Sequence, residues 1–103
     1  MSFGEAIAMA RKKKGLSQKH LAAMIPKEDG EPISPQYLND LERDRRNPPA
    51  GPLLDQFASR LDIPRDYLYL IARELPRDVD VETKDPHIVE QAFAAFRHEL
   101  QKG

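Results

Sequence analysis

The sequence contains no cysteine, which excludes a disulfide, a thiol nucleophile and a cysteine-based zinc or iron–sulfur site. It has no apolar run near the ~18 residues that a membrane span needs, and no apolar signal-peptide stretch at its N-terminus. Its 16 basic and 17 acidic side chains nearly cancel, so it is not a polybasic protein. Its 103 residues fit one small domain, or one domain with an appendage. We therefore expect a small cytoplasmic protein that does not contact a membrane.

Motifs for catalysis and for cofactor binding are also missing. The three histidines form no ligand pair such as H-E-x-x-H, and there is no glycine-rich phosphate loop. His20 and His87 fall where surface or capping roles are expected, and the acidic residues are not paired in a recognisable cleft. We therefore expect no enzyme, no metal site and no cofactor.

Capping residues and apolar spacing predict a string of short helices, and so an all-α fold. Ser2 and Glu5 form a capping box that starts the first helix, and Gly15 is a typical stop. Ser17 starts a second helix, and Ser34 followed by proline starts a third. Apolar positions at helical spacing predict three more, over about 51–61, around Tyr67, Leu68 and Ile71, and from Pro86 onward with Ile88, Val89, Ala92, Phe93, Phe96 and Leu100 on one stripe. The alternating segment from Asp78 to Glu82 is a linker or a short edge strand.

The expected third helix has one apolar and one polar face. Leu38 and Leu41 define the buried side, and Tyr37 lies at its border. Glutamine and asparagine can pair with adenine edges, and aspartate can accept a hydrogen bond from cytosine. Such a face either reads DNA or is an ordinary solvated surface; its polar residues are Gln36, Asn39, Asp40 and Arg43.

Several segments in the first 72 residues together resemble one family. They are Phe3-Gly4-Glu5-Ala6-Ile7 with Arg11, Gly15-Leu16-Ser17-Gln18-Lys19-His20-Leu21-Ala22, Ile33-Ser34-Pro35-Gln36-Tyr37-Leu38-Asn39-Asp40-Leu41-Glu42-Arg43, Arg45-Arg46-Asn47-Pro48 and Phe57-Ala58-Ser59-Arg60-Leu61-Asp62-Ile63. In these stretches the chain resembles the Xre/Cro-type helix-turn-helix regulators of bacteria and phages, which have a lambda-repressor-like DNA-binding domain. The resemblance implies a five-helix domain over residues 1–75 that binds double-stranded DNA as a homodimer, with the third helix in the major groove. It implies a bacterial repressor that binds a palindromic operator and is associated with the nucleoid when bound.

The same resemblance assigns roles to individual residues. It implies that Arg11 and Glu42 form a structural ion pair, and that the Gln18 amide braces both a phosphate and the recognition helix. Lys12, Lys13 and Lys14 are either phosphate neighbours or solvated charges. With the polar face above, the candidate base contacts are Gln36, Tyr37, Asn39 and Asp40, and the candidate phosphate contacts are Gln18, Lys19, Ser34, Arg43, Arg45, Arg46 and Asn47.

The chain departs from the family pattern between the second and third helices. The usual tight turn is replaced by a longer segment from Pro26 to Pro32 with three acids and one lysine. Acidic side chains next to phosphates are repelled, so we expect this insertion to bulge away from the DNA.

The tail lies outside the resemblance. An acidic, proline-containing linker over 76–85 leads to a C-terminal amphipathic helix over 86–103. The stripe of Ile88, Val89, Phe93, Phe96 and Leu100 needs a partner surface, which is its own domain, a second subunit, or a groove for a sensor or protein partner. We favour a second subunit. The alternative function is the antitoxin of a toxin–antitoxin pair, which binds DNA and captures a toxin through this tail; a restriction–modification controller is a further possibility.

Overall fold

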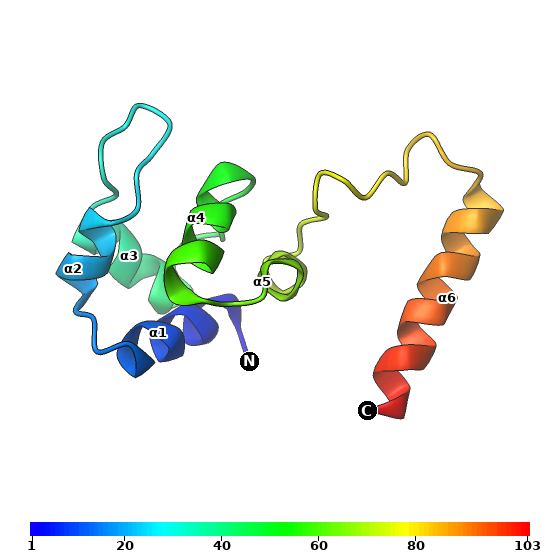
Figure 1. The fold of residues 1–103 in the computed structure, drawn as a ribbon, viewed down its shortest axis with the longest axis horizontal. Coiled ribbons are helices and arrows are strands. Elements are labelled where there is room, and N and C mark those ends of the chain that lie inside the picture. Colours follow the sequence, from blue (N-terminus) through cyan, green and yellow to red (C-terminus); the bar gives the residue numbers. More distant parts are fainter.

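The computed structural model describes all 103 residues and contains six helices and no strand. They are α1 (Phe3–Lys13), α2 (Gln18–Ala23), α3 (Pro35–Glu42), α4 (Pro52–Leu61), α5 (Arg65–Ile71) and α6 (Pro86–Lys102). Figure 1 shows the first five gathered in one bundle, while α6 stands apart at the end of an extended segment. The prediction of an all-α fold with five helices and a separate C-terminal helix is confirmed.

The capping residues predicted from the sequence cap the helices in the structure. The Ser2 hydroxyl accepts from the Glu5 N–H at 3.1 Å, and the Glu5 carboxylate accepts from the Ser2 N–H at 3.1 Å. The hydroxyls of Ser17 and Ser34 likewise cap α2 and α3. Gly15 follows α1 with a φ of 70°, a conformation in which glycine avoids the steric penalty of a Cβ.

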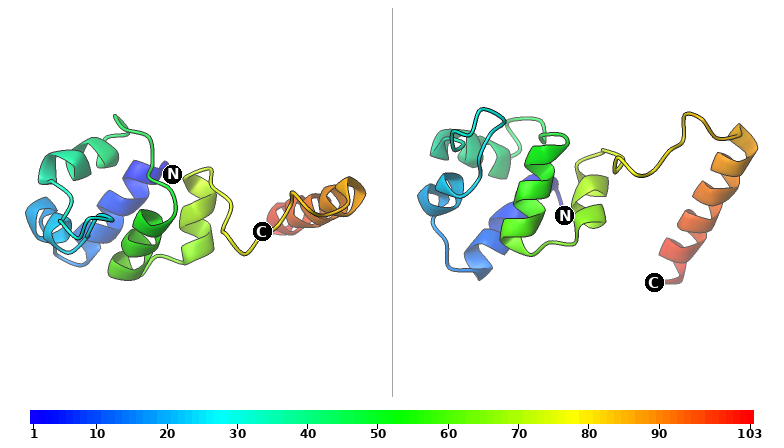
Figure 2. Two further views of the ribbon diagram at one scale, coloured as in Figure 1. Left: turned by 90° about the horizontal axis from the view of Figure 1, so that it is seen from above. Right: turned by 45° about the horizontal axis from the view of Figure 1, so that its top comes forward.

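One apolar core joins the five bundled helices. α1 packs against α3 and α4, α2 against α3, and α4 against α5. The rings of Phe3 and Phe57 meet edge to face, with centroids 6.5 Å apart, and Leu38 and Leu41 of α3 are fully buried. Figure 2 shows the same bundle from two further directions, with α6 clear of it in both. α3 is therefore held by its apolar face, and its other face is left to the solvent.

One expectation is corrected. The side chain of Tyr67 is 43% exposed, and Tyr69 is buried in its place, with its hydroxyl donating to the Asp55 carboxylate at 2.7 Å. Of the two alternatives for Asp78 to Glu82, a linker or a short edge strand, the structure has no strand there.

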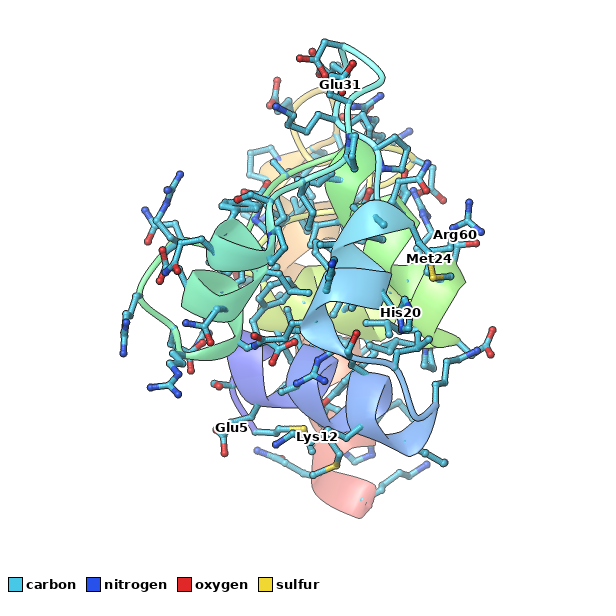
Figure 3. The ribbon with its side chains drawn as sticks, turned by 90° about the vertical axis from the view of Figure 1, so that its left-hand side faces the viewer. Glu5, Lys12, His20, Met24, Glu31 and Arg60 are labelled. Carbon is cyan, nitrogen blue, oxygen red and sulfur yellow. The ribbon has the colours of Figure 1, made fainter.

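The insertion between α2 and α3 closes at its own base. Pro26 and Pro32 form an isolated bridge, and the Lys27 N–H donates to the Glu31 carbonyl at 2.8 Å. The loop projects beyond the bundle, and Figure 3 places Glu31 at its tip, far from Lys12 on α1. Ile33, directly after the loop, is buried and donates its N–H to the Ile25 carbonyl. The longer connection therefore leaves α2 and α3 packed together.

Arg11 of α1 and Glu42 of α3 form a bidentate ion pair inside the bundle. The Arg11 Nε–Glu42 Oε2 distance is 2.7 Å and the Arg11 Nη2–Glu42 Oε1 distance is 2.9 Å. The two side chains are only 10% and 5% exposed. Hydrogen bonding to Glu42 raises the pKa of Arg11, which favours the charged guanidinium.

We predict that this pair contributes to stability as a unit. Arg11→Ala and Glu42→Ala should each lower the free energy of unfolding by about 3–5 kcal/mol, because each leaves a buried charge without its partner. The double variant should lose less than the sum of the two, as measured by chemical denaturation. Lys14→Ala, which breaks the exposed pair with Asp62, is the matched control and should cost less than about 1 kcal/mol. Additive losses from the two buried residues would contradict a coupled pair.

Candidate nucleic-acid interface

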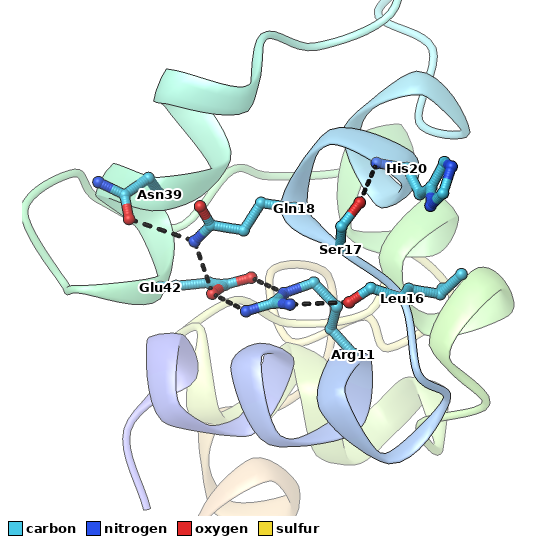
Figure 4. A network of polar contacts seen from close by, with 7 residues as sticks. All are labelled: Arg11, Leu16, Ser17, Gln18, His20, Asn39 and Glu42. Carbon is cyan, nitrogen blue, oxygen red and sulfur yellow. Dashed lines mark hydrogen bonds and ion pairs between the residues drawn. The ribbon is translucent and has the colours of Figure 1, made fainter.

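A network of polar contacts links α1, α2 and α3 beneath the exposed face of α3 (Figure 4). The Gln18 amide nitrogen, on α2, donates to Glu42 Oε1 at 3.0 Å and to Asn39 Oδ1 at 3.2 Å. Arg11 also donates to the Leu16 carbonyl at 2.8 Å, which ties the α1–α2 turn to the same network. Three helices thus share one set of hydrogen bonds, and α3 is positioned at its last turn.

The network uses both N–H groups of the Gln18 amide within the protein. A phosphate oxygen is an acceptor, so a phosphate contact from this amide requires that one of these bonds be given up. Asn39 is half-buried and its carbonyl oxygen is occupied by Gln18. These two residues therefore lie at the inner edge of the exposed face.

The outward part of α3 presents Gln36, Tyr37 and Asp40 in neighbouring turns. Gln36 is exposed, and its amide nitrogen donates to Asp40 Oδ1 at 3.1 Å across one helical turn. Arg45 approaches the same Asp40 oxygen with its Nη1 at 3.9 Å, and its N–H donates to the Asp40 carbonyl at 2.8 Å. The Asp40 carboxylate is thus shared between an amide and a guanidinium.

Tyr37 lies half-buried at the border of the polar face. The guanidinium of Arg46 stands over its ring, 5.1 Å from the centroid, at a distance typical of a cation–π contact. Burial raises the pKa of the Tyr37 hydroxyl, and the charge of Arg46 opposes this in part. The hydroxyl therefore stays protonated at neutral pH and can donate as well as accept a hydrogen bond.

The turn after α3 carries three exposed arginines and an asparagine. The side chains of Arg43, Arg45, Arg46 and Asn47 are all exposed, and Lys19 and Ser34 lie exposed at the starts of α2 and α3. The structure therefore brings the candidate phosphate contacts around the polar face of α3. Lys12, Lys13 and Lys14 are exposed at the far end of α1.

Asp44 and Gly4 were not among the residues expected from the sequence to shape the site. Asp44 has a φ of 57°, and its carboxylate accepts from the Gly4 N–H at 3.0 Å and from the Ser2 hydroxyl at 2.7 Å. A Cβ on Gly4 would stand 2.5 Å from the Leu41 carbonyl oxygen, so only glycine lets α1 approach the end of α3 this closely. The contact spans about 40 positions of sequence, and the only local signal was a glycine in the first turn of a helix.

No group of three or more histidine, aspartate or glutamate side chains is arranged to hold a metal ion. No helix has both the length and the apolar character that crossing a membrane requires.

Comparison with known proteins identifies the family. The helix-turn-helix family model matches residues 7–68, more than half of the chain and all of the network and the polar face described above. The structure is similar to a solved SinR protein/SinI protein complex, with a TM-score of 0.53 and 26% sequence identity over 97% of this chain and 92% of that chain. No curated protein sequence matches. The chain therefore belongs to the Xre/lambda-repressor-like helix-turn-helix family and is a DNA-binding transcriptional regulator.

Proposed function

We propose that the protein is a bacterial repressor that binds a near-palindromic operator as a dimer, with α3 of each subunit in the major groove. The DNA-binding unit is residues 1–75, followed by the linker at 76–85 and the tail at 86–103. The observation that carries the proposal is the exposed face of α3, with amide, phenol and carboxylate groups flanked by three arginines. A protein in the major groove excludes other proteins from the same DNA, and this exclusion is the basis of repression.

The dimensions of α3 suit the groove. An α-helix with its side chains is about 10–12 Å across, close to the ~12 Å width of the major groove of B-DNA, and the eight residues of α3 form about two turns. Gln36, Tyr37 and Asp40 are the proposed base contacts, with Asn39 at the edge. The proposed phosphate contacts are Gln18, Lys19, Ser34, Arg43, Arg45, Arg46 and Asn47.

The acidic residues near α3 do not cancel the arginines. Glu42 is neutralised by Arg11, and Asp44 is held at the N-terminus of α1, where the helix dipole favours a negative charge. The acidic insertion projects beyond the bundle, with Glu31 at its tip (Figure 3). Although the chain has a net charge of −1, the surface around α3 is locally positive, as a phosphate-binding surface must be.

A second candidate function is that of an antitoxin, which binds its operator and also a toxin. The observation that favours it is the apolar stripe of α6, none of whose residues is buried. The solved structure to which this chain is similar is a complex of two different proteins, SinR and SinI, which agrees with protein binding by a chain of this shape. A reading frame for a small toxin next to this one would favour the antitoxin over a repressor that acts alone.

Selection from random duplexes tests the proposed function. The purified protein should enrich a near-palindrome whose half-sites lie about 10 bp apart, one turn of the double helix, because two α3 helices related by a two-fold axis enter successive major grooves. A selection that enriches no palindromic or repeated element contradicts the proposal.

Substitutions within the site should separate base contacts from phosphate contacts. Gln36→Ala and Asp40→Ala should relax sequence preference by about 1–3 kcal/mol of discrimination, and at the same base pair, because the two side chains are hydrogen-bonded to each other. Arg45→Ala and Arg46→Ala should weaken binding to all sequences and reduce the salt slope by about 1 each.

Binding titrations at several salt concentrations, on the selected operator and on its single-base variants, distinguish the two classes. Arg60→Ala removes an exposed arginine from α4, on the side of the bundle away from α3, and should leave both readouts unchanged (Figure 3). Unchanged base preference in both α3 variants would remove Gln36 and Asp40 from the interface.

A further inference from the structure

Asp44 follows α3 in a backbone conformation that residues other than glycine rarely adopt. Its φ is 57°, its N–H donates to the Leu41 carbonyl at 3.1 Å, and the Arg45 N–H donates to the Asp40 carbonyl at 2.8 Å. These two bonds commonly end a helix at a left-handed residue, which is usually glycine because a Cβ is disfavoured there. An aspartate at this position therefore costs backbone stability that a glycine would not.

The Asp44 side chain connects the end of α3 to the start of α1. Its Oδ1 accepts from the Gly4 N–H at 3.0 Å, and its Oδ2 accepts from the Ser2 hydroxyl at 2.7 Å. Hydrogen bonds to a carboxylate are stronger than those between neutral groups, and the N-terminus of a helix favours a negative charge. Both carboxylate oxygens are thus held at α1, which is itself packed into the core through Phe3 and Ile7.

The segment around Asp44 has few other attachments to the bundle. No residue between Leu41 and Leu54 is buried, and the backbone N–H groups from Arg46 to Gly51 donate no hydrogen bond within the protein. From residue 43 to residue 50, Asp44 is the only one whose side chain is hydrogen-bonded to a helix other than α3. The turn after α3 is therefore anchored to the bundle mainly through this carboxylate.

Arg45 and Arg46 come directly after the anchor. Arg45 Nη1 lies 3.9 Å from Asp40 Oδ1, and the Arg46 guanidinium stands over the Tyr37 ring. Both side chains therefore lie along α3, beside the proposed base contacts. They keep these places only while the backbone that carries them stays in place.

We infer that Asp44 is a positioning residue for DNA binding, which holds the turn after α3 against α1 and so places Arg45 and Arg46 where they meet phosphates. The inference rests on the phosphate contacts proposed above for these two arginines. A turn that is fixed before DNA arrives loses less conformational freedom on binding than a free one, and this saving increases affinity.

The inference predicts an effect opposite in sign to that of simple electrostatics. The Asp44 carboxylate is negative and lies next to a phosphate-binding turn, so repulsion alone predicts that its removal strengthens DNA binding. If the carboxylate acts as an anchor, its removal weakens binding instead.

Binding titrations with the full-length protein decide between the two. Asp44→Gly keeps the left-handed backbone and removes both hydrogen bonds to α1. It should weaken binding to the selected operator about 10-fold, because two long side chains are then ordered only when DNA binds. The loss should be the same on single-base variants of the operator, since phosphate contacts carry no sequence information.

Two further variants control for charge and for folding. Asp44→Asn removes the charge but keeps an oxygen for the Gly4 N–H, and asparagine tolerates the left-handed conformation, so it should retain most of the affinity. Asp62→Gly makes the same change at the end of α4, where an aspartate with a φ of 54° pairs only with the exposed Lys14. It should not weaken binding. Thermal unfolding should show every variant folded at the temperature of the titrations.

A mutant cycle tests whether Asp44 acts through the arginines. In a protein that carries Arg45→Ala and Arg46→Ala, Asp44→Gly should have no further effect on binding, at a salt concentration at which this weaker protein still binds. An equal loss in that background would mean that Asp44 acts through the fold and would overturn the inference. Stronger binding by Asp44→Gly than by the unmodified protein would overturn it as well.

The outcome is separable from that of the proposed function. If Arg45→Ala and Arg46→Ala leave binding unchanged, the proposed phosphate contacts fail and the role of Asp44 falls with them. If these substitutions weaken binding and Asp44→Gly does not, only the role of Asp44 fails.

Discussion

The buried ion pair between Arg11 and Glu42 is the contact on which the geometry of the site depends. α2 has only six residues and is joined to α3 by a long connection. The pair connects the last turn of α3 to α1. Gln18 of α2 donates to the same Glu42 carboxylate, which connects α2 to both. Because Glu42 is almost fully enclosed, it has no alternative partner in solvent. The polar face of α3 is therefore presented in one orientation.

The same arrangement explains how a chain with a net charge of −1 can bind DNA. The acidic groups closest to α3 are engaged within the protein: Glu42 with Arg11, Asp44 with the start of α1, and Asp40 with Gln36 and Arg45. The arginines of the following turn remain exposed. Local placement of charge, rather than the overall balance, makes this surface attractive to phosphate.

Much of the fold could be predicted from the sequence because its signals are local. A serine cap followed by Glu5, or by Pro35, acts within a single turn, and these starts are where the helices begin. The polar face of α3 follows from helical periodicity around Leu38 and Leu41 in the same way.

The features that could not be predicted depend on contacts between distant segments. Tyr67 and Tyr69 both fit an apolar position on α5, and the choice is made by Asp55 and the Gly51 carbonyl, which accept from the Tyr69 hydroxyl. The contact between Asp44 and Gly4 likewise could not be predicted from the sequence, because the two residues are 40 positions apart. These contacts position elements, whereas the polar face of α3 follows from the helix pattern, and the phosphate contacts follow from the family resemblance.

The most direct test of the account is a titration of the isotope-labelled protein with a selected operator duplex, followed by NMR of backbone amides and of arginine and glutamine side chains. The account predicts large shifts for Gln36–Arg43 and the arginines of the following turn, with the Arg11 Nε–H signal unchanged because its bond to Glu42 persists. A change in the Arg11 Nε–H signal, or signal shifts that do not include α3, would contradict the account.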